Sequence, residues 1–192
     1  MDFDKVIKER RSTRKFSNEK VDKNKIIEMI ECARLAPSAG NRQPWHFVVL
    51  ENDLKDKVAN IMEKQIMGVD VTLDAENATH AYTPVASLKS SIRIIKEAPI
   101  LILVFRKRSD DWLEGDYLSI GGAVEHICLK ATDYGLGSLW VRDVVYTRDK
   151  IAKAVGYENL ELVTGVVIGH SIEFPYERSK KKLTDIMEWK NE

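Results

Sequence analysis

The sequence predicts a single domain in which helices and strands alternate along the chain. Segments with apolar residues at helical spacing are separated by short runs rich in valine, isoleucine and leucine. No internal repeat or low-complexity linker divides the 192 residues, a length that suits one domain with a sizeable core. The alternation alone favours an ordinary α/β sheet within one domain spanning residues 1–192.

Apolar periodicity places the individual elements. Ile26, Met29 and Ala33 lie on one face of a helix expected over residues 23–35. Further helices are expected over residues 54–67, 86–96, 117–134 and 148–155, and strands over residues 46–50, 100–105, 139–141 and 162–168. Gly135 is the expected C-cap of the longest helix.

The longest predicted helix contains two adjacent glycines, Gly121 and Gly122. Each glycine inside a helix costs about 1 kcal/mol relative to alanine, so an interior pair needs a compensating role. Close approach of another backbone would supply that role, and a helix from a second subunit is a candidate.

Two segments lack clear periodicity. We interpret residues 68–84 as an irregular excursion, either a lid-like arm whose His80 and Tyr82 touch a substrate or a solvent-facing arm. Residues 174–192 form a charged tail whose isolated apolar side chains need a partner surface. These side chains are Ile186, Met187 and Trp189.

Composition and charge exclude several classes of protein. Thirty basic and thirty acidic residues cancel, so no overall field attracts nucleic acid or an anionic membrane. The longest apolar run, residues 99–105, is far shorter than the roughly 20 residues of a membrane-spanning helix. The N-terminal residues lack the apolar stretch of a secretory signal, so a cytoplasmic location is expected. Cys32 and Cys128 fall within helical patterns and are interpreted as buried structural thiols.

The first candidate binding site is a basic cluster near the N-terminus, Arg-Arg-Ser-Thr-Arg-Lys-Phe over residues 10–16. If this segment is extended, Arg10, Ser12 and Arg14 project to one side because side chains alternate along a strand. Guanidinium groups and a hydroxyl suit phosphate oxygens, although a solvated basic turn has the same pattern. The basic run at residues 177–182 is either a second wall of the same site or a solvated face.

The second candidate is the loop Ala-Pro-Ser-Ala-Gly-Asn-Arg-Gln-Pro-Trp over residues 36–45. Two prolines stiffen it, and Gly40 permits a positive φ. Its backbone N–H groups, together with Asn41 and Gln43, could face a flat heteroaromatic ring; alternatively, they satisfy only the turn itself.

Motifs for other chemistries are missing from the sequence. No G-x-G-x-x-G follows a predicted strand, and neither a P-loop, a G-x-S-x-G elbow nor an H-E-x-x-H is present. The four histidines are scattered without ligand spacing. Nucleophilic catalysis and a metal site therefore have little support.

Five motifs in this order resemble those of the nitroreductase family of flavoproteins. They are residues 10–14, residues 36–45, the Gly121-Gly122 pair, residues 134–140, and Gly169 followed by Pro175 and Arg178. The resemblance covers nearly the whole chain apart from residues 68–84. It implies an α+β fold with a mainly antiparallel central sheet flanked by helices, in place of the α/β sheet that the pattern alone favours. It also implies an intertwined homodimer with two FMN sites at the subunit interface, in which residues 174–192 wrap the partner.

The resemblance assigns roles to particular residues. The FMN ligands it implies from the basic regions are Arg10, Arg11, Ser12, Arg14, Arg178 and Lys180, with Arg178 and Lys180 holding the phosphate from the other side. The loop that approaches the ring from the second subunit contributes Pro37, Ser38, Asn41 and Gln43. The strand end that packs on the ring contributes Leu139, Trp140, Val141 and Arg142, of which Trp140 and Arg142 depart from the family's usual residues. A backbone N–H near Arg142 or Asp143 would approach N5, and Arg11 or Arg14 is the candidate donor to N1 and O2.

The activity implied is transfer of hydride from NADH or NADPH through flavin N5 to a small acceptor such as a nitroaromatic, a quinone or a flavin, with ping-pong kinetics. No protein side chain is expected to act as a nucleophile or essential base. One alternative is an FMN carrier or sensor of the same fold without significant turnover. Another is a phosphate- or RNA-binding adaptor, which the neutral charge and the lack of interleaved aromatic residues disfavour.

Overall fold

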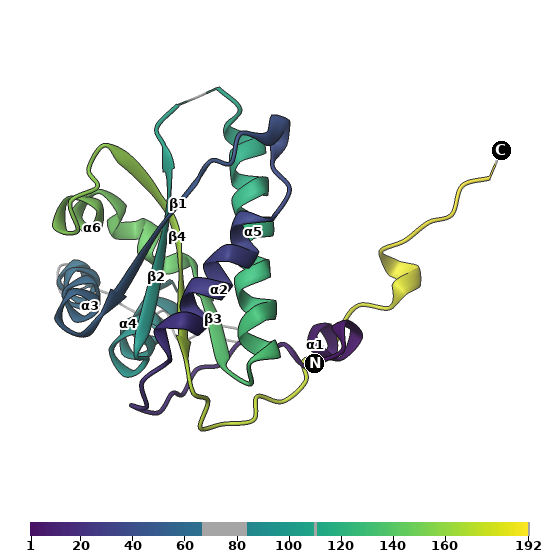
Figure 1. Cartoon of the computed structure of the whole chain (residues 1–192), viewed down its shortest axis with the longest axis horizontal. Helices are drawn as coiled ribbons and strands as arrows, with labels where there is room; N and C mark the ends of the chain where they lie inside the picture. The colour runs from purple at the N-terminus through teal and green to yellow at the C-terminus, as the bar shows by residue number, and fades with distance from the viewer. Residues whose placement is uncertain (67–83, 110, 192) are drawn as a thin grey trace, which may run out of the picture.

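A computed structural model of the chain describes residues 1–66, 84–109 and 111–191. Its centre is one four-stranded sheet in the order β1-β2-β4-β3, and every neighbouring pair is antiparallel (Figure 1). The strands are β1 (Trp45–Glu51), β2 (Ile100–Lys107), β3 (Gly137–Val141) and β4 (Leu160–Gly169). The α+β fold implied by the resemblance is confirmed, and the α/β sheet favoured by the alternation alone is wrong.

The run of apolar residues in β2 is consistent with the wrong α/β prediction, because such runs are typical of strands buried on both faces. Ile100, Ile102 and Val104 pack on one side of the sheet, and Leu101 and Leu103 pack on the other, because side chains alternate along a strand. Helices cover both faces, so even this antiparallel strand shows no polar alternation.

The helices form two layers around the sheet (Figure 1). The layer on one face contains α2 (Lys23–Arg34) and α5 (Leu113–Asp133), and the other face carries α3 (Asn52–Ile66), α4 (Pro84–Glu97) and α6 (Arg148–Ala154). Shorter helices are α1 (Phe3–Glu9), η1 (Ala39–Asn41), η3 (Arg142–Thr147) and η4 (Leu183–Asp185). No helix of the described ranges is long and apolar enough to cross a membrane.

The predicted elements lie where periodicity placed them, with shifts at their ends. α5 begins at Leu113, one turn earlier than expected, and Gly135 adopts a left-handed φ of 70° after it, as the C-cap assignment requires. Pro84, expected to end the irregular excursion, instead begins α4. The rest of that excursion, with His80 and Tyr82, lies outside the described residues.

The basic segment at residues 10–16 runs beside the edge strand β3. Ser12 and Ser138 form a parallel β-bridge, and the Thr13 backbone N–H donates to the Ser138 carbonyl at 2.9 Å. A Cβ added to Gly137 would lie 2.6 Å from Thr13 Oγ1 and 2.9 Å from Thr13 Cβ. Glycine at position 137 therefore permits the contact that fixes the basic segment.

The C-terminal tail passes α1 and extends away from the body of the chain (Figure 1). Its apolar side chains are exposed, including Phe174, Tyr176 and Trp189. Among the residues that the structure describes, none packs over them enough to bury them.

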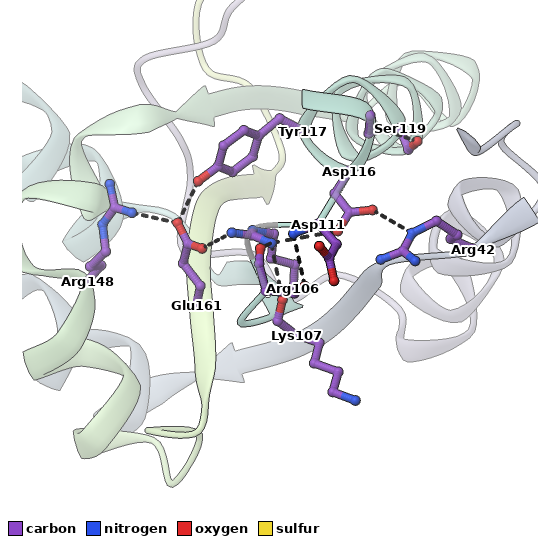
Figure 2. Close-up of polar contacts among 11 residues, drawn as sticks. Arg42, Arg106, Lys107, Asp111, Asp116, Tyr117, Ser119, Arg148 and Glu161 are labelled. Atoms are coloured by element: carbon purple, nitrogen blue, oxygen red, sulfur yellow. Dashed lines mark hydrogen bonds and ion pairs between the residues drawn. The ribbon is translucent and has the colours of Figure 1, made fainter. Parts of the chain in front are cut away.

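A buried ionic network joins both central strands to α5 and α6 (Figure 2). The Arg106 side chain of β2 is 3% exposed; its Nη2 lies 2.6 Å from Glu161 Oε2 on β4, and its Nη1 lies 3.7 Å from Asp116 Oδ2 on α5. Arg148 Nη1 and Tyr117 Oη donate to Glu161 Oε1 at 2.7 and 2.6 Å. Sequence patterns gave no sign of this network.

Replacing Glu161 with glutamine tests how much the network stabilises the fold. We expect the free energy of unfolding to fall by about 3 kcal/mol, because a buried guanidinium loses its charged partner. In urea titrations the control Arg108→Gln, which removes an exposed ion pair with Asp149, should cost less than about 1 kcal/mol. Equal losses in the two variants would contradict a stabilising role for the buried pair.

Cys128 of α5 provides a test of burial through pH. Burial raises the pKa of its thiol from the usual 9.0 to about 11, and a hydrogen bond with Ser138 offsets part of this rise. Between these two values the unfolded chain releases the thiol proton while the folded chain retains it, so the free energy of unfolding should fall by about 1.4 kcal/mol per pH unit. Cys128→Ala should lack this part of the slope in urea titrations; an unchanged slope would show that other groups cause it.

Candidate functional site

The basic segment and the C-terminal tail meet at a cleft of about 590 Å³. Residues from opposite ends of the sequence therefore line the same cleft beside β3. The predicted site residues that line it are Arg10, Arg11, Ser12, Arg14, Arg178 and Lys180. The structure thus brings together every residue assigned to the two basic regions.

This cleft carries a strong local positive charge within a chain of zero net charge. Eight cationic side chains face two carboxylates, those of Glu173 and Glu177. The cations are Lys8, Arg10, Arg11, Arg14, Lys15, Arg93, Arg178 and Lys180. Such a surface suits a multiply charged anion.

Some of these cations are held by neighbours, and others have free donors. Arg10 Nε lies 3.3 Å from Glu125 Oε1, and Arg11 Nη2 lies 3.8 Å from Glu177 Oε1. Arg178 and Lys180, by contrast, make no hydrogen bond or ion pair with any described residue, and the same holds for the Ser12 hydroxyl. The cleft therefore presents unpaired donors to a ligand.

Arg93 of α4 is a member of the cleft that sequence reasoning missed. Its Nη2 donates to the Arg14 carbonyl at 3.4 Å, and its Nη1 pairs with Glu97 at 2.7 Å. In the sequence, an arginine four residues before a glutamate is typical of a solvated helix surface.

A second groove, of about 360 Å³, adjoins the cleft along the edge strand β3. Arg14 lines both spaces, so the groove borders the cationic cleft at this residue. The groove is lined by the predicted residues Leu139, Trp140, Val141 and Arg142. A ligand with an anionic end and a flat ring would extend from the cleft past Arg14 and along β3.

The other groove residues come from α4 and η3. Asp143 is buried, and its Oδ2 accepts hydrogen bonds from Ser87 Oγ at 2.7 Å and Ser91 Oγ at 2.8 Å. Arg142 is exposed and donates through Nη1 to Tyr146 Oη at 2.6 Å. The two serines were not identified from the sequence, because hydroxyls in a helix carry no distinctive pattern.

The β3 side chains differ in direction. Leu139 and Val141 pack into the core cluster on the α3 and α4 side. Trp140 lies toward α5, where its Nε1 donates to Thr164 Oγ1 at 2.7 Å and its ring approaches Gly121. The strand therefore offers its edge, rather than a stack of side chains, to most of the groove.

The loop at residues 36–45 has the unusual backbone that its composition suggested. Gly40, Asn41 and Gln43 have φ values of 56°, 53° and 48°, in the left-handed region. The Gln43 N–H donates to Ser38 Oγ at 3.0 Å, which closes the turn. Gly40 thus adopts the positive φ predicted for it.

This loop lies apart from the other site residues within one chain. It leads into β1, and β1 and β3 are opposite edges of the sheet, about 14 Å apart at the usual strand spacing. Neither the cleft nor the groove is lined by its predicted ligands, which are Pro37, Ser38, Asn41 and Gln43.

Comparisons with known proteins agree with this architecture. The model of the nitroreductase family matches residues 7–170. An Archaeoglobus fulgidus protein provisionally named NADH dehydrogenase/NAD(P)H nitroreductase is 29% identical over 92% of this chain and 86% of its own length. The iodotyrosine deiodinase of Thermotoga neapolitana is 29% identical over 70% of each chain.

Among solved structures, the FMN and NADPH-dependent nitroreductase NfnB from Sphigopyxis sp. strain HMH superimposes with a TM-score of 0.81. The alignment covers 100% of both chains at 19% identity, so it bears on the fold alone. The match of the family model over most of the sequence, together with the shared fold, shows that this chain belongs to the nitroreductase family.

Proposed function

We propose that this protein is an FMN-dependent oxidoreductase, working as a homodimer, that passes reducing equivalents from NADH or NADPH to a small acceptor. The observation that carries the proposal is the cationic cleft, which shares Arg14 with the groove along β3. Membership of the nitroreductase family supports it, as does the name of the related FMN and NADPH-dependent enzyme.

The cleft fits the phosphate end of FMN. A phosphate monoester carries nearly two negative charges at neutral pH and accepts several hydrogen bonds. The donors of Ser12, Arg178 and Lys180 have no other described partner, and Arg10 has only a 3.3 Å contact with Glu125. We assign these four residues to the phosphate.

The groove fits the ring end. Arg14 lines both the cleft and the groove, and its guanidinium, or that of Arg11 in the cleft, is the proposed group that stabilises negative charge at N1 and O2. The backbone N–H of Arg142 or Asp143 is the proposed donor at N5. When bound, FMN supplies the hydride-accepting and hydride-donating chemistry. The protein side chains bind and orient the ring and tune its potential, and none acts as a nucleophile.

A second copy of the chain would complete this site. Leu118 is 78% exposed on α5, and a Cβ added to neighbouring Gly122 meets no atom within 4 Å, so this helix face is uncovered. The C-terminal tail carries further exposed apolar side chains, among them Phe174, Tyr176 and Trp189. Packing of α5 against its symmetry mate, with the tail around the partner, would cover both surfaces.

The acceptor is proposed only by class. A nitroaromatic, a quinone or a free flavin each presents a flat electrophilic system to an open ring face. A relative is named for deiodination, which shows that members of this family differ in substrate.

Arg178→Ala tests the phosphate assignment. The affinity for FMN should fall by about 1.5–3 kcal/mol, the usual loss for a hydrogen bond to a charged group. Riboflavin, which lacks the phosphate, should bind parent and variant equally in fluorescence titrations. Lys181→Ala is the control, because Lys181 does not line the cleft. Unchanged FMN affinity in the Arg178 variant would refute the assignment.

Turnover is tested by adding NADH or NADPH to the flavin-loaded protein without oxygen. Rapid bleaching of the yellow absorbance should follow, and parallel lines should appear in double-reciprocal plots when an acceptor is varied, because donor and acceptor use the same open face in turn. Unchanged absorbance with both donors would favour a flavin carrier, and intersecting lines would contradict the ping-pong scheme.

A further inference from the structure

We infer that Arg42 and Asp116 position the loop at residues 36–45 and that they act on the flavin bound by the other subunit. This inference rests on the proposed FMN site. It assigns a positioning role to two residues that the sequence motifs did not single out, on the basis of the ionic network in Figure 2.

Arg42 is the charged side chain of this loop, since the other nine residues are apolar or neutral. Its Nε donates to Asp116 Oδ1 at 3.3 Å, and its guanidinium carbon lies 5.8 Å from the centre of the Trp112 ring. The side chain remains partly exposed. Arg42 therefore makes the ion pair that holds the loop to the body of the chain.

Asp116 is a rigid anchor for that contact. Its side chain is 4% exposed, and its second oxygen lies 3.7 Å from Arg106 Nη1, which belongs to the network of the central strands (Figure 2). A hydrogen bond also holds the loop to α5: the Ala39 N–H donates to Ser119 Oγ at 3.1 Å. Gly115 lets the loop approach closely, because a Cβ there would lie 3.0 Å from Ala39 Cβ.

The backbone on either side of Arg42 explains why an anchor is needed. Asn41 and Gln43 both have positive φ, a conformation that residues with side chains seldom adopt unless surrounding contacts impose it. The Arg42–Asp116 contact lies between these two residues. Its loss should allow the loop to relax and should move Asn41 and Gln43 away from their positions.

The sheet topology separates this loop from the groove of its own chain. Loop and groove are at opposite edges of one sheet, and no residue of the loop lines the cleft or the groove. We therefore assign the loop to the ring held by a second copy of the chain. Asp116 and Arg42 of one subunit thus set the ring environment of its partner.

Arg42→Met tests the positioning role. The affinities for FMN and for riboflavin should fall by the same factor, on the order of tenfold, because the ring is common to both ligands. The visible spectrum of bound flavin should shift, while the urea midpoint should match that of the parent. Arg34→Met, which removes an exposed pair with Glu31, is the control and should change none of these. Parent-like affinities and spectrum in the Arg42 variant would overturn the inference.

Asp116→Asn is a second variant at the anchor and should give the same spectral shift as Arg42→Met if it folds. Failure of the parent to bind FMN at all would instead refute the proposed function, so the two failures are distinguishable.

A mixed dimer tests the placement across subunits. Arg42→Met and Arg178→Ala chains carrying different tags are co-expressed, and the mixed dimer is purified through both tags. If the loop acts on the partner, one of the two sites combines an intact loop with an intact phosphate cleft, and the other combines both defects. FMN titration should then show one site of parent affinity. Two weak sites would place the loop in its own chain's site and overturn the inference.

Discussion

The ion pair between Arg106 of β2 and Glu161 of β4 is the contact on which the rest of the structure depends. It joins the two central strands, and through Asp116 it extends to the first turns of α5 and to the loop that precedes β1. Buried charges of this kind require well-placed partners, since each has been removed from water. Arg106 Nε has no hydrogen-bond partner among the described residues. The guanidinium is thus oriented toward the two carboxylates, and one of its N–H donors is left without an acceptor.

The elements of the fold were predictable from the sequence because their apolar periodicity is strong, as in the face formed by Ile26, Met29 and Ala33. The direction of the strands was not. β2 is buried on both faces, and a strand so covered has the same composition whether its neighbours are parallel or antiparallel. Only the order of motifs along the chain, compared with a known family, indicated the antiparallel arrangement.

The candidate site was predictable to the extent that its chemistry is local. Alternating cations and a hydroxyl at residues 10–14 indicated an anion site, and the structure places them on one cleft. Residues whose role depends on tertiary contacts had no such pattern in the sequence. Arg93 resembles a solvated helix residue, and Ser87 and Ser91 become notable only beside Asp143. In the sequence, nothing distinguishes Asp116 from the other acidic residues, of which there are thirty in all. Only the fold buries it against two arginines.

The length of α5, 21 residues, has a consequence for how this protein can vary. One turn of this helix holds the loop at residues 36–45 through Ser119, and a later turn carries Glu125, the partner of Arg10. α5 therefore sets the position of this loop, which we assign to one FMN site of the proposed dimer, relative to Arg10, which we assign to the other site. A single inserted or deleted residue between the two turns would rotate one of these contacts by about 100° relative to the other and shift it by about 1.5 Å along the helix. Divergence among relatives should accordingly accumulate in loops and termini, while the spacing between these two turns stays fixed.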